Sequence, residues 1–115
     1  MKTLSKKIIA VLEARDWNVC SVDKQGKEYV AELETTSPAG EDFAPTIRYD
    51  GTSADFARAF DRYALDFDPD EHAEDLARYR GTNGVPNSIR TLINDADEIK
   101  KLLEDTADAL REAVA

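Results

Sequence analysis

The sequence predicts an α+β fold: a three-stranded antiparallel sheet packed against helices, in the order α-β-β-β-α-α-α, with a long C-terminal helix. Over residues 18–50 apolar and polar side chains alternate with period two, which is typical of strands with one buried face. On both sides of that segment, apolar residues return every three or four positions, the spacing of amphipathic helices. The 115 residues are 42% hydrophobic, enough for one core, so we expect a single domain over residues 1–115.

The first helix is expected over residues 3–15, where apolar side chains fall on one face: Leu4, Ile8, Val11 and Leu12. Two strands follow, over residues 18–23 and 27–36. Between them, the segment from Asp23 to Gly26 has the residues of a type I turn, with aspartate first and glycine fourth. The first two strands are therefore expected to form a hairpin.

The third strand is expected over residues 43–50, after a type I turn at residues 37–40 (Ser-Pro-Ala-Gly). Phe43, Ile47 and Tyr49 share one face of it. Pro45 has no N–H group to donate to a neighbouring strand, so we expect this strand at an edge of the sheet.

Two helices are expected next. Thr52 or Ser53 caps the first, whose aromatic-rich stripe should cover the sheet: Phe56, Phe60, Tyr63, Ala64 and Phe67. Asp68 caps the second, because proline follows it and Glu71 stands three positions later.

The last helix follows a break at residues 81–87. Its apolar seam repeats at spacings of three and four: Ile89, Leu92, Ala96, Ile99, Leu103, Thr106, Leu110 and Ala113. Asn94 and Asp95 mark the place where it would be interrupted. Unbroken, the helix would span roughly 40 Å at 1.5 Å per residue. The seam either packs inside the domain, which we favour because the sheet needs a cover, or forms a homodimer or a groove for a partner helix.

Charge restricts the partners. The net charge is −9, and residues 52–115 hold 15 of the 24 acidic side chains. This balance argues against direct binding of nucleic acid or of an anionic membrane, and favours protein partners with basic surfaces. The alternative interpretation is that the negative charge serves only to keep the protein soluble.

No metal, cofactor or catalytic site is predicted. Asp66, Asp68 and Asp70 alternate like the start of a calcium loop, but Glu71 and Ala77 stand where an EF-hand needs glycine and glutamate. Helix capping explains these carboxylates better, because a helix N-terminus is positive.

Neither zinc binding nor catalysis has enough suitable residues. The chain has one histidine, His72, and one cysteine, Cys20, too few for zinc. Phosphate loops and nucleophile motifs are absent, and Asp42, beside Phe43, is the nearest case of a carboxylate in apolar surroundings. We expect Cys20 to be buried. A single cysteine allows no intramolecular disulfide, so a reducing compartment, the cytoplasm, is expected.

Three segments together resemble a family of small acidic proteins from gut Firmicutes and Actinobacteria, often found on conjugative elements and phages: SPAGEDF (37–43), FDPDEHAEDL (67–76) and GVPNSIRTLINDADEIKKLLEDTADAL (84–110). The resemblance covers most of the chain from residue 30 onward and brings no catalytic or binding residues with it. It implies a context, because mobile elements encode small acidic inhibitors of host defences, including anti-CRISPR and anti-restriction proteins, some of which imitate the charge of DNA.

We therefore expect a non-enzymatic binding protein whose acidic helical half docks on a basic, nucleic-acid-handling partner such as a defence nuclease. The residues expected to make this contact are Asp66, Asp68, Asp70, Glu71, Glu74, Asp75, Asp97, Glu98, Glu104, Asp105 and Asp108. The alternative is a structural homodimer or accessory subunit assembled through the C-terminal seam.

Overall fold

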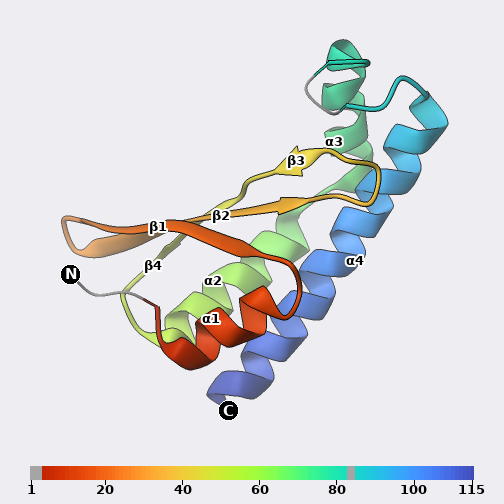
Figure 1. Ribbon diagram of the computed structural model, residues 1–115. Coiled ribbons are helices and arrows are strands. Elements are labelled where there is room, and N and C mark those ends of the chain that lie inside the picture. The colour runs from red at the N-terminus through yellow and green to blue at the C-terminus, as the bar shows by residue number, and fades with distance from the viewer. Residues whose placement is uncertain (1–3, 83–84) are drawn as a thin grey trace.

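An antiparallel sheet lies over a layer of helices in the computed structural model, which describes residues 4–82 and 85–115 (Figure 1). The elements in chain order are α1 Lys6–Glu13, β1 Asn18–Gln25, β2 Glu28–Thr36, β3 Asp42–Phe43, β4 Thr46–Tyr49, α2 Ser53–Asp66, α3 Pro69–Leu76, a 3-10 helix at Ala77–Tyr79, and α4 Ile89–Val114. The α+β class and the order of elements are confirmed, except that the third strand is divided. Residue 3 of the expected first helix and residues 83–84 of the expected break lie outside the described residues.

Strand β2 is central in the sheet. It pairs with β1 on one side and with β3 and β4 on the other, always antiparallel. The third strand divides at Pro45, whose carbonyl accepts from the Leu33 N–H at 3.1 Å but which has no N–H to return. Within the described residues β4 pairs only with β2, so the expectation that this strand lies at an edge is confirmed.

The hairpin between β1 and β2 is tighter than expected. Gln25 pairs with Glu28, which leaves Gly26 and Lys27 as a two-residue loop. Gly26 has a φ of +66°, a conformation that glycine adopts without strain and that matches the twist of two-residue hairpins. The expected type I turn at residues 23–26 is therefore wrong, because the strands continue past Asp23.

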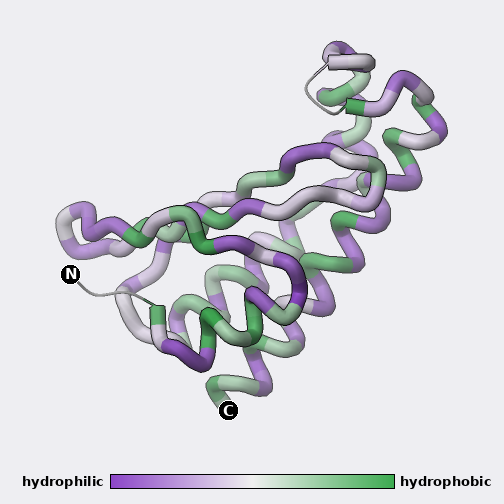
Figure 2. The backbone as a smooth tube through the Cα atoms, in the orientation of Figure 1, coloured by the Kyte–Doolittle hydropathy of each residue, from purple (hydrophilic) through white to green (hydrophobic). Residues whose placement is uncertain are grey.

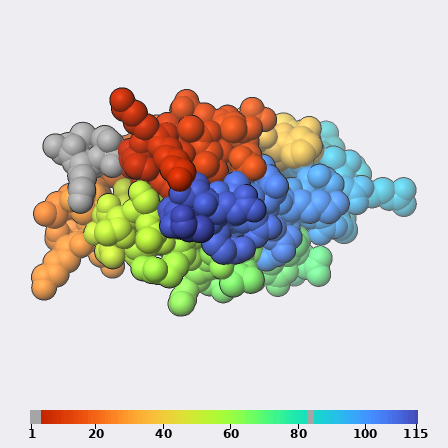
Figure 3. Space-filling model, turned by 90° about the horizontal axis from the view of Figure 1, so that it is seen from below, coloured from red at the N-terminus to blue at the C-terminus, as the bar shows by residue number. Residues whose placement is uncertain are grey.

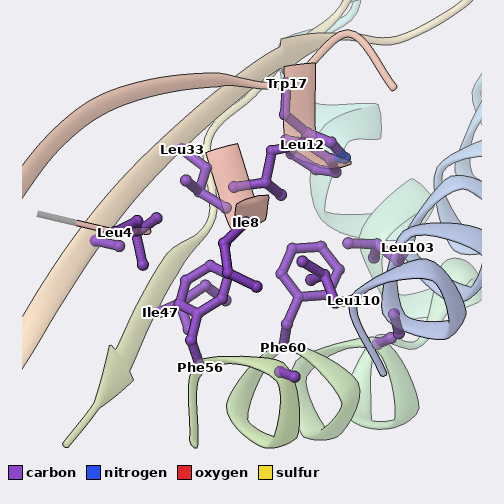
Figure 4. Close-up of a cluster of buried hydrophobic side chains, with 14 of the residues drawn as sticks. Leu4, Ile8, Leu12, Trp17, Leu33, Ile47, Phe56, Phe60, Leu103 and Leu110 are labelled. Carbon is purple, nitrogen blue, oxygen red and sulfur yellow. The ribbon is translucent and has the colours of Figure 1, made fainter. Parts of the chain in front are cut away.

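Apolar and polar residues alternate along the helices (Figure 2), and the apolar residues are buried between the helices and the sheet. Seen from the side opposite the sheet, α4 lies between α1 and α2 (Figure 3). Phe56 and Phe60 of α2 project toward Ile8 and Leu12 of α1 in the main core (Figure 4). Trp17 packs edge-on against Phe60, with ring centroids 5.8 Å apart.

Helix α4 is unbroken and sets the long dimension of the molecule, which measures 41 × 27 × 22 Å. Its first turns extend beyond the main core and form a second apolar cluster with α3 and with the chain just before α4: Ala73, Val85, Leu92 and Ala96. Asp95 does not interrupt the helix but lies buried within it, 3% exposed. Helix α4 thus has the full length expected without a break. Helix α3 covers the N-terminal part of α4 that extends beyond the main core.

The seam of α4 packs inside the domain. Six of its eight residues are buried against the chain's own helices and sheet: Leu92, Ala96, Ile99, Leu103, Thr106 and Leu110. Thr106 is polar, but its hydroxyl accepts from Trp17 Nε1 at 3.0 Å and donates to the Leu102 carbonyl at 2.7 Å. Ile89 is 52% exposed and Ala113 half-buried. The expectation that the seam packs inside the domain is confirmed.

Candidate functional site: an acidic groove beside strand β4

An open groove of about 520 Å³ lies between β4, the outer side of α2 and the start of α3. We call it the β4 groove. Its apolar lining comes from Phe43, Ile47, Ala59, Tyr63 and Phe67. Its charged and polar lining comes from Thr46, Arg48, Arg62, Asp66, Asp68, Glu71, His72 and Asp75. A concave surface with an apolar floor and polar groups at its rim is the usual form of a binding site.

The corner between α2 and α3 places four carboxylates at one end of the groove. Helix α2 ends at Asp66, and Asp68 then caps α3, accepting from the N–H groups of Asp70 at 3.0 Å and Glu71 at 3.3 Å. Pro69 occupies the first helical turn, as expected. The positive N-terminus of α3 stabilises Asp68 and Glu71, as the sequence indicated. It does not account for Asp66, which ends α2, or for Asp75, which lies in the last turn of α3.

Lys100 of α4 fixes the end of α2. Its ammonium group donates to the main-chain carbonyls of Ala64, Leu65 and Phe67, the latter two at 3.3 and 3.0 Å. These carbonyls belong to the last turn of a helix, where cations are favourable. Because Lys100 is held by the backbone, its charge is directed to the end of α2 and not to the carboxylates of the groove.

A buried polar network lies behind the groove. Asp95 accepts from the Ser37 hydroxyl at 2.5 Å and from the Ala39 N–H at 3.0 Å. The Ser37 hydroxyl in turn accepts from the Glu41 N–H at 3.0 Å. The Glu41 carboxylate lies 2.9 Å from Nε2 of His72, which also packs against the rings of Phe43 and Phe67. These contacts fasten the turn at residues 37–40 to α4 and the chain before β3 to α3.

Three sequence segments, residues 37–43, 67–76 and 84–110, contribute side chains to this network. The first supplies Ser37 and Glu41, the second His72 and the third Asp95. Ser37, Glu41 and Asp95 are each less than 5% exposed. Since Ser37 is buried and bonded on both sides, the network is built as a support for the fold and not as an accessible nucleophile.

All eleven carboxylates expected to bind a partner are exposed, but they do not form one cluster. Helix α3 divides its own: Glu71 and Asp75 line the β4 groove with Asp66 and Asp68, whereas Asp70 and Glu74 lie on the other flank, beside an apolar hollow formed with Ile89, Leu92 and Ile93. The remaining five lie on the exposed side of α4: Asp97, Glu98, Glu104, Asp105 and Asp108.

Three of the α4 carboxylates form ion pairs. Glu98 pairs with Lys101 at 3.3 Å, Asp105 with Arg15 at 2.9 Å and Asp108 with Arg111 at 3.0 Å. The other eight of the eleven form no ion pair with any residue in the described part of the chain. Carboxylates without an ion-pair partner contribute most to the negative electrostatic potential around the protein.

Among residues 4–82 and 85–115, no three His, Cys, Asp or Glu side chains are arranged to hold a metal ion. None of the helices in those ranges is both long and apolar enough to cross a membrane.

Cys20 lies on the surface, not in the core as expected, because the pairing of β1 with β2 shifts register between Val19 and Ser21 and leaves Cys20 unpaired in a bulge. Its thiol lies 3.6 Å from the Glu34 carboxylate. Desolvation by neighbouring side chains, followed by the negative charge of Glu34, raises the pKa of Cys20.

Iodoacetamide is expected to alkylate Cys20 more slowly at pH 8 than it alkylates free cysteine. Only the thiolate reacts, and a raised pKa lowers the thiolate fraction until the pH exceeds that pKa. Glu34→Gln should speed the reaction, and Glu32→Gln should do so less, because the contribution of Glu32 is smaller. Rates measured from pH 7 to 10 check this. Equal rates at pH 8 for the parent protein and free cysteine would contradict it.

Comparison of the chain with protein-family models, with curated proteins and with solved structures finds no match in any of the three.

Proposed function

We propose that the chain is a non-enzymatic binding protein of a mobile element, whose acidic surface docks on a basic, nucleic-acid-handling protein such as a CRISPR or restriction nuclease. The observation that supports this is the exposure of all eleven carboxylates together with the lack of ion pairs at eight of them within the described residues. Such a surface competes with phosphates for lysine and arginine, so binding should weaken steeply with salt.

Assembly through the seam of α4 finds no support of this kind. Six of its eight residues, Leu103 and Leu110 among them, are buried in the monomer, and Ile89 at the start of the helix is the one large seam side chain that is exposed, so the seam offers little surface to a second chain. We therefore propose the acidic surface, and not the seam, as the binding surface.

Reversal of four charges on α3 is expected to abolish partner binding. The variant replaces Asp70, Glu71, Glu74 and Asp75 with lysine, all exposed positions, and keeps the cap residue Asp68. The fold should therefore persist, with a modest loss of stability at the N-terminus of α3, while the contact becomes repulsive. The test is affinity capture from a native-host lysate, with stepwise elution by salt and analysis by mass spectrometry. The parent protein should capture a nucleic-acid-binding protein, and the variant should not. Added DNA should release that protein from the parent.

The matched control carries the same change in net charge elsewhere, with lysine at Glu13, Asp23, Glu32 and Glu34, which are exposed positions on α1, β1 and β2. It should retain the partner, although at a slower association rate, because long-range steering depends on total charge. Unchanged capture by the α3 variant would show that its carboxylates are not the contact and would refute the proposed function.

A further inference from the structure

We propose that the β4 groove binds an extended basic segment of the partner, which joins the sheet as an additional strand beside β4. This inference rests on the proposed function and specifies which part of the partner is recognised. Strand addition is a common mode of peptide recognition, in which main-chain hydrogen bonds supply affinity and alternate side chains supply specificity.

The register of the sheet leaves the outer edge of β4 available. Ile47 pairs with Ala31 and Tyr49 with Tyr29, and the Pro45 carbonyl accepts from the Leu33 N–H. In an antiparallel ladder, alternate residues direct their N–H and C=O groups to opposite sides. The main-chain groups of Thr46 and Arg48 are therefore directed away from β2, toward the groove.

Pro45 does not block this edge. Proline protects an edge strand when its missing N–H would have faced an incoming strand. Here the carbonyl of Pro45 faces β2, and in an antiparallel pair the N–H and C=O of one residue point to the same side. The missing donor is therefore on the β2 side, and the outward donors of Thr46 and Arg48 are unaffected.

The floor of the groove suits one face of such a strand. A strand added about 4.8 Å from β4 would lie over the outer side of α2. Helix α2 passes beneath β4 (Figure 1), and its side chains there, Ala59 and Tyr63, are half-buried. Every second side chain of the incoming segment would rest on this apolar surface, and the others would point to solvent.

Charge complementarity selects a basic segment. Asp66, Asp68, Glu71 and Asp75 line the groove, and no described residue forms an ion pair with them. Arg48 forms an ion pair with Glu28 at 3.5 Å, and Lys100 donates hydrogen bonds to main-chain carbonyls at the end of α2. Arg62 lines the groove one turn before Asp66, so the acidic end is the end near α3. Lysine or arginine of the partner would supply the missing counter-charge there.

The test uses a synthetic ten-residue peptide, blocked at both ends, in which lysine alternates with valine and threonine. Titration of the full-length protein, followed by amide NMR shifts and hydrogen exchange, should show saturable binding, with the Thr46 and Arg48 amides newly protected. N-methylation of alternate peptide amides on one edge should weaken binding roughly tenfold, whereas methylation on the other edge should leave it unchanged. Charge is equal in the two peptides, so only main-chain pairing separates them.

Two variants of the protein test the same main-chain pairing from the side of β4. Thr46→Pro removes an N–H that is not used by β2 and should weaken peptide binding roughly tenfold, whereas Thr46→Val keeps the N–H and should bind like the parent. Replacing Asp66, Glu71 and Asp75 with the corresponding amides should weaken binding and flatten its dependence on salt.

The outcomes separate this inference from the proposed function. No saturable binding at millimolar peptide, equal binding of both methylated peptides, or shifts confined to other surfaces would overturn strand addition. If the parent protein still captured a salt-sensitive basic partner, the proposed function would stand without it. A dimer in the absence of peptide that Thr46→Pro dissociates would show instead that β4 pairs with a second copy, which also overturns the inference.

Discussion

Replacement of Leu103 with glutamate is expected to unfold the monomer. Leu103 is fully buried near the middle of α4, in the same cluster as Phe60 and Leu110. Loss of a buried leucine side chain costs about 2–5 kcal/mol, and an unpaired buried carboxylate adds several more. A domain of this size is stable by about 5–15 kcal/mol, so the two losses together remove most or all of its stability. Circular dichroism and thermal unfolding measure the effect.

The matched control is Ile93→Glu, on the same helix but 44% exposed. It should retain the helical spectrum and lower the free energy of unfolding by less than about 1 kcal/mol, because its carboxylate stays in water. Sedimentation of both variants provides the decisive comparison. If Leu103→Glu sedimented as a folded monomer while the parent protein sedimented as a dimer, the seam would be an interface between chains.

Features that depend on local or periodic sequence were predictable. The stripe of α2, the cap at Asp68 and the edge position of the strand containing Pro45 each follow from a few neighbouring residues. The burial of the α4 seam follows from its period, although only the structure decides whether it packs inside the domain or between chains. The sequence predicted which carboxylates would be exposed at the candidate site. It did not predict that α3 would place them on two opposite flanks.

Features that depend on residues distant in sequence were missed. Ser37 and Asp95 are 58 positions apart, and Glu41 and His72 are 31 apart. Asp42 was the carboxylate expected in apolar surroundings, yet Asp42 is exposed and its neighbour Glu41 is buried, because alternation along a strand reverses the side at each residue. One signal was available: Asp95 stands three residues after Leu92 and four before Ile99, on the buried face of the helix.

Replacement of Asp95 with alanine is expected to lower the free energy of unfolding by about 3–5 kcal/mol, because hydrogen bonds to a charged group contribute about 1.5–3 kcal/mol each. The change leaves the Ser37 hydroxyl and the Ala39 N–H without their acceptor, 2.5 and 3.0 Å away in the parent. Asp95→Asn keeps one acceptor oxygen for Ala39 and should cost less. Asp97→Ala, two residues away on the exposed side, should be nearly neutral. Urea unfolding of the three variants measures these differences.

The same substitution should also reach the groove. The turn held by Asp95 leads directly to Glu41, which contacts His72 on the groove wall, and then to β3 and β4. In Asp95→Ala the Ala39 amide should exchange with solvent at denaturant concentrations too low to unfold the domain, because the turn opens locally. If Ala39 exchanged only with global unfolding and the stability matched that of the parent, the buried network would not support the turn. The position of β4 beside α2 would then depend on its pairing with β2 and on the apolar packing of Phe43 and Ile47.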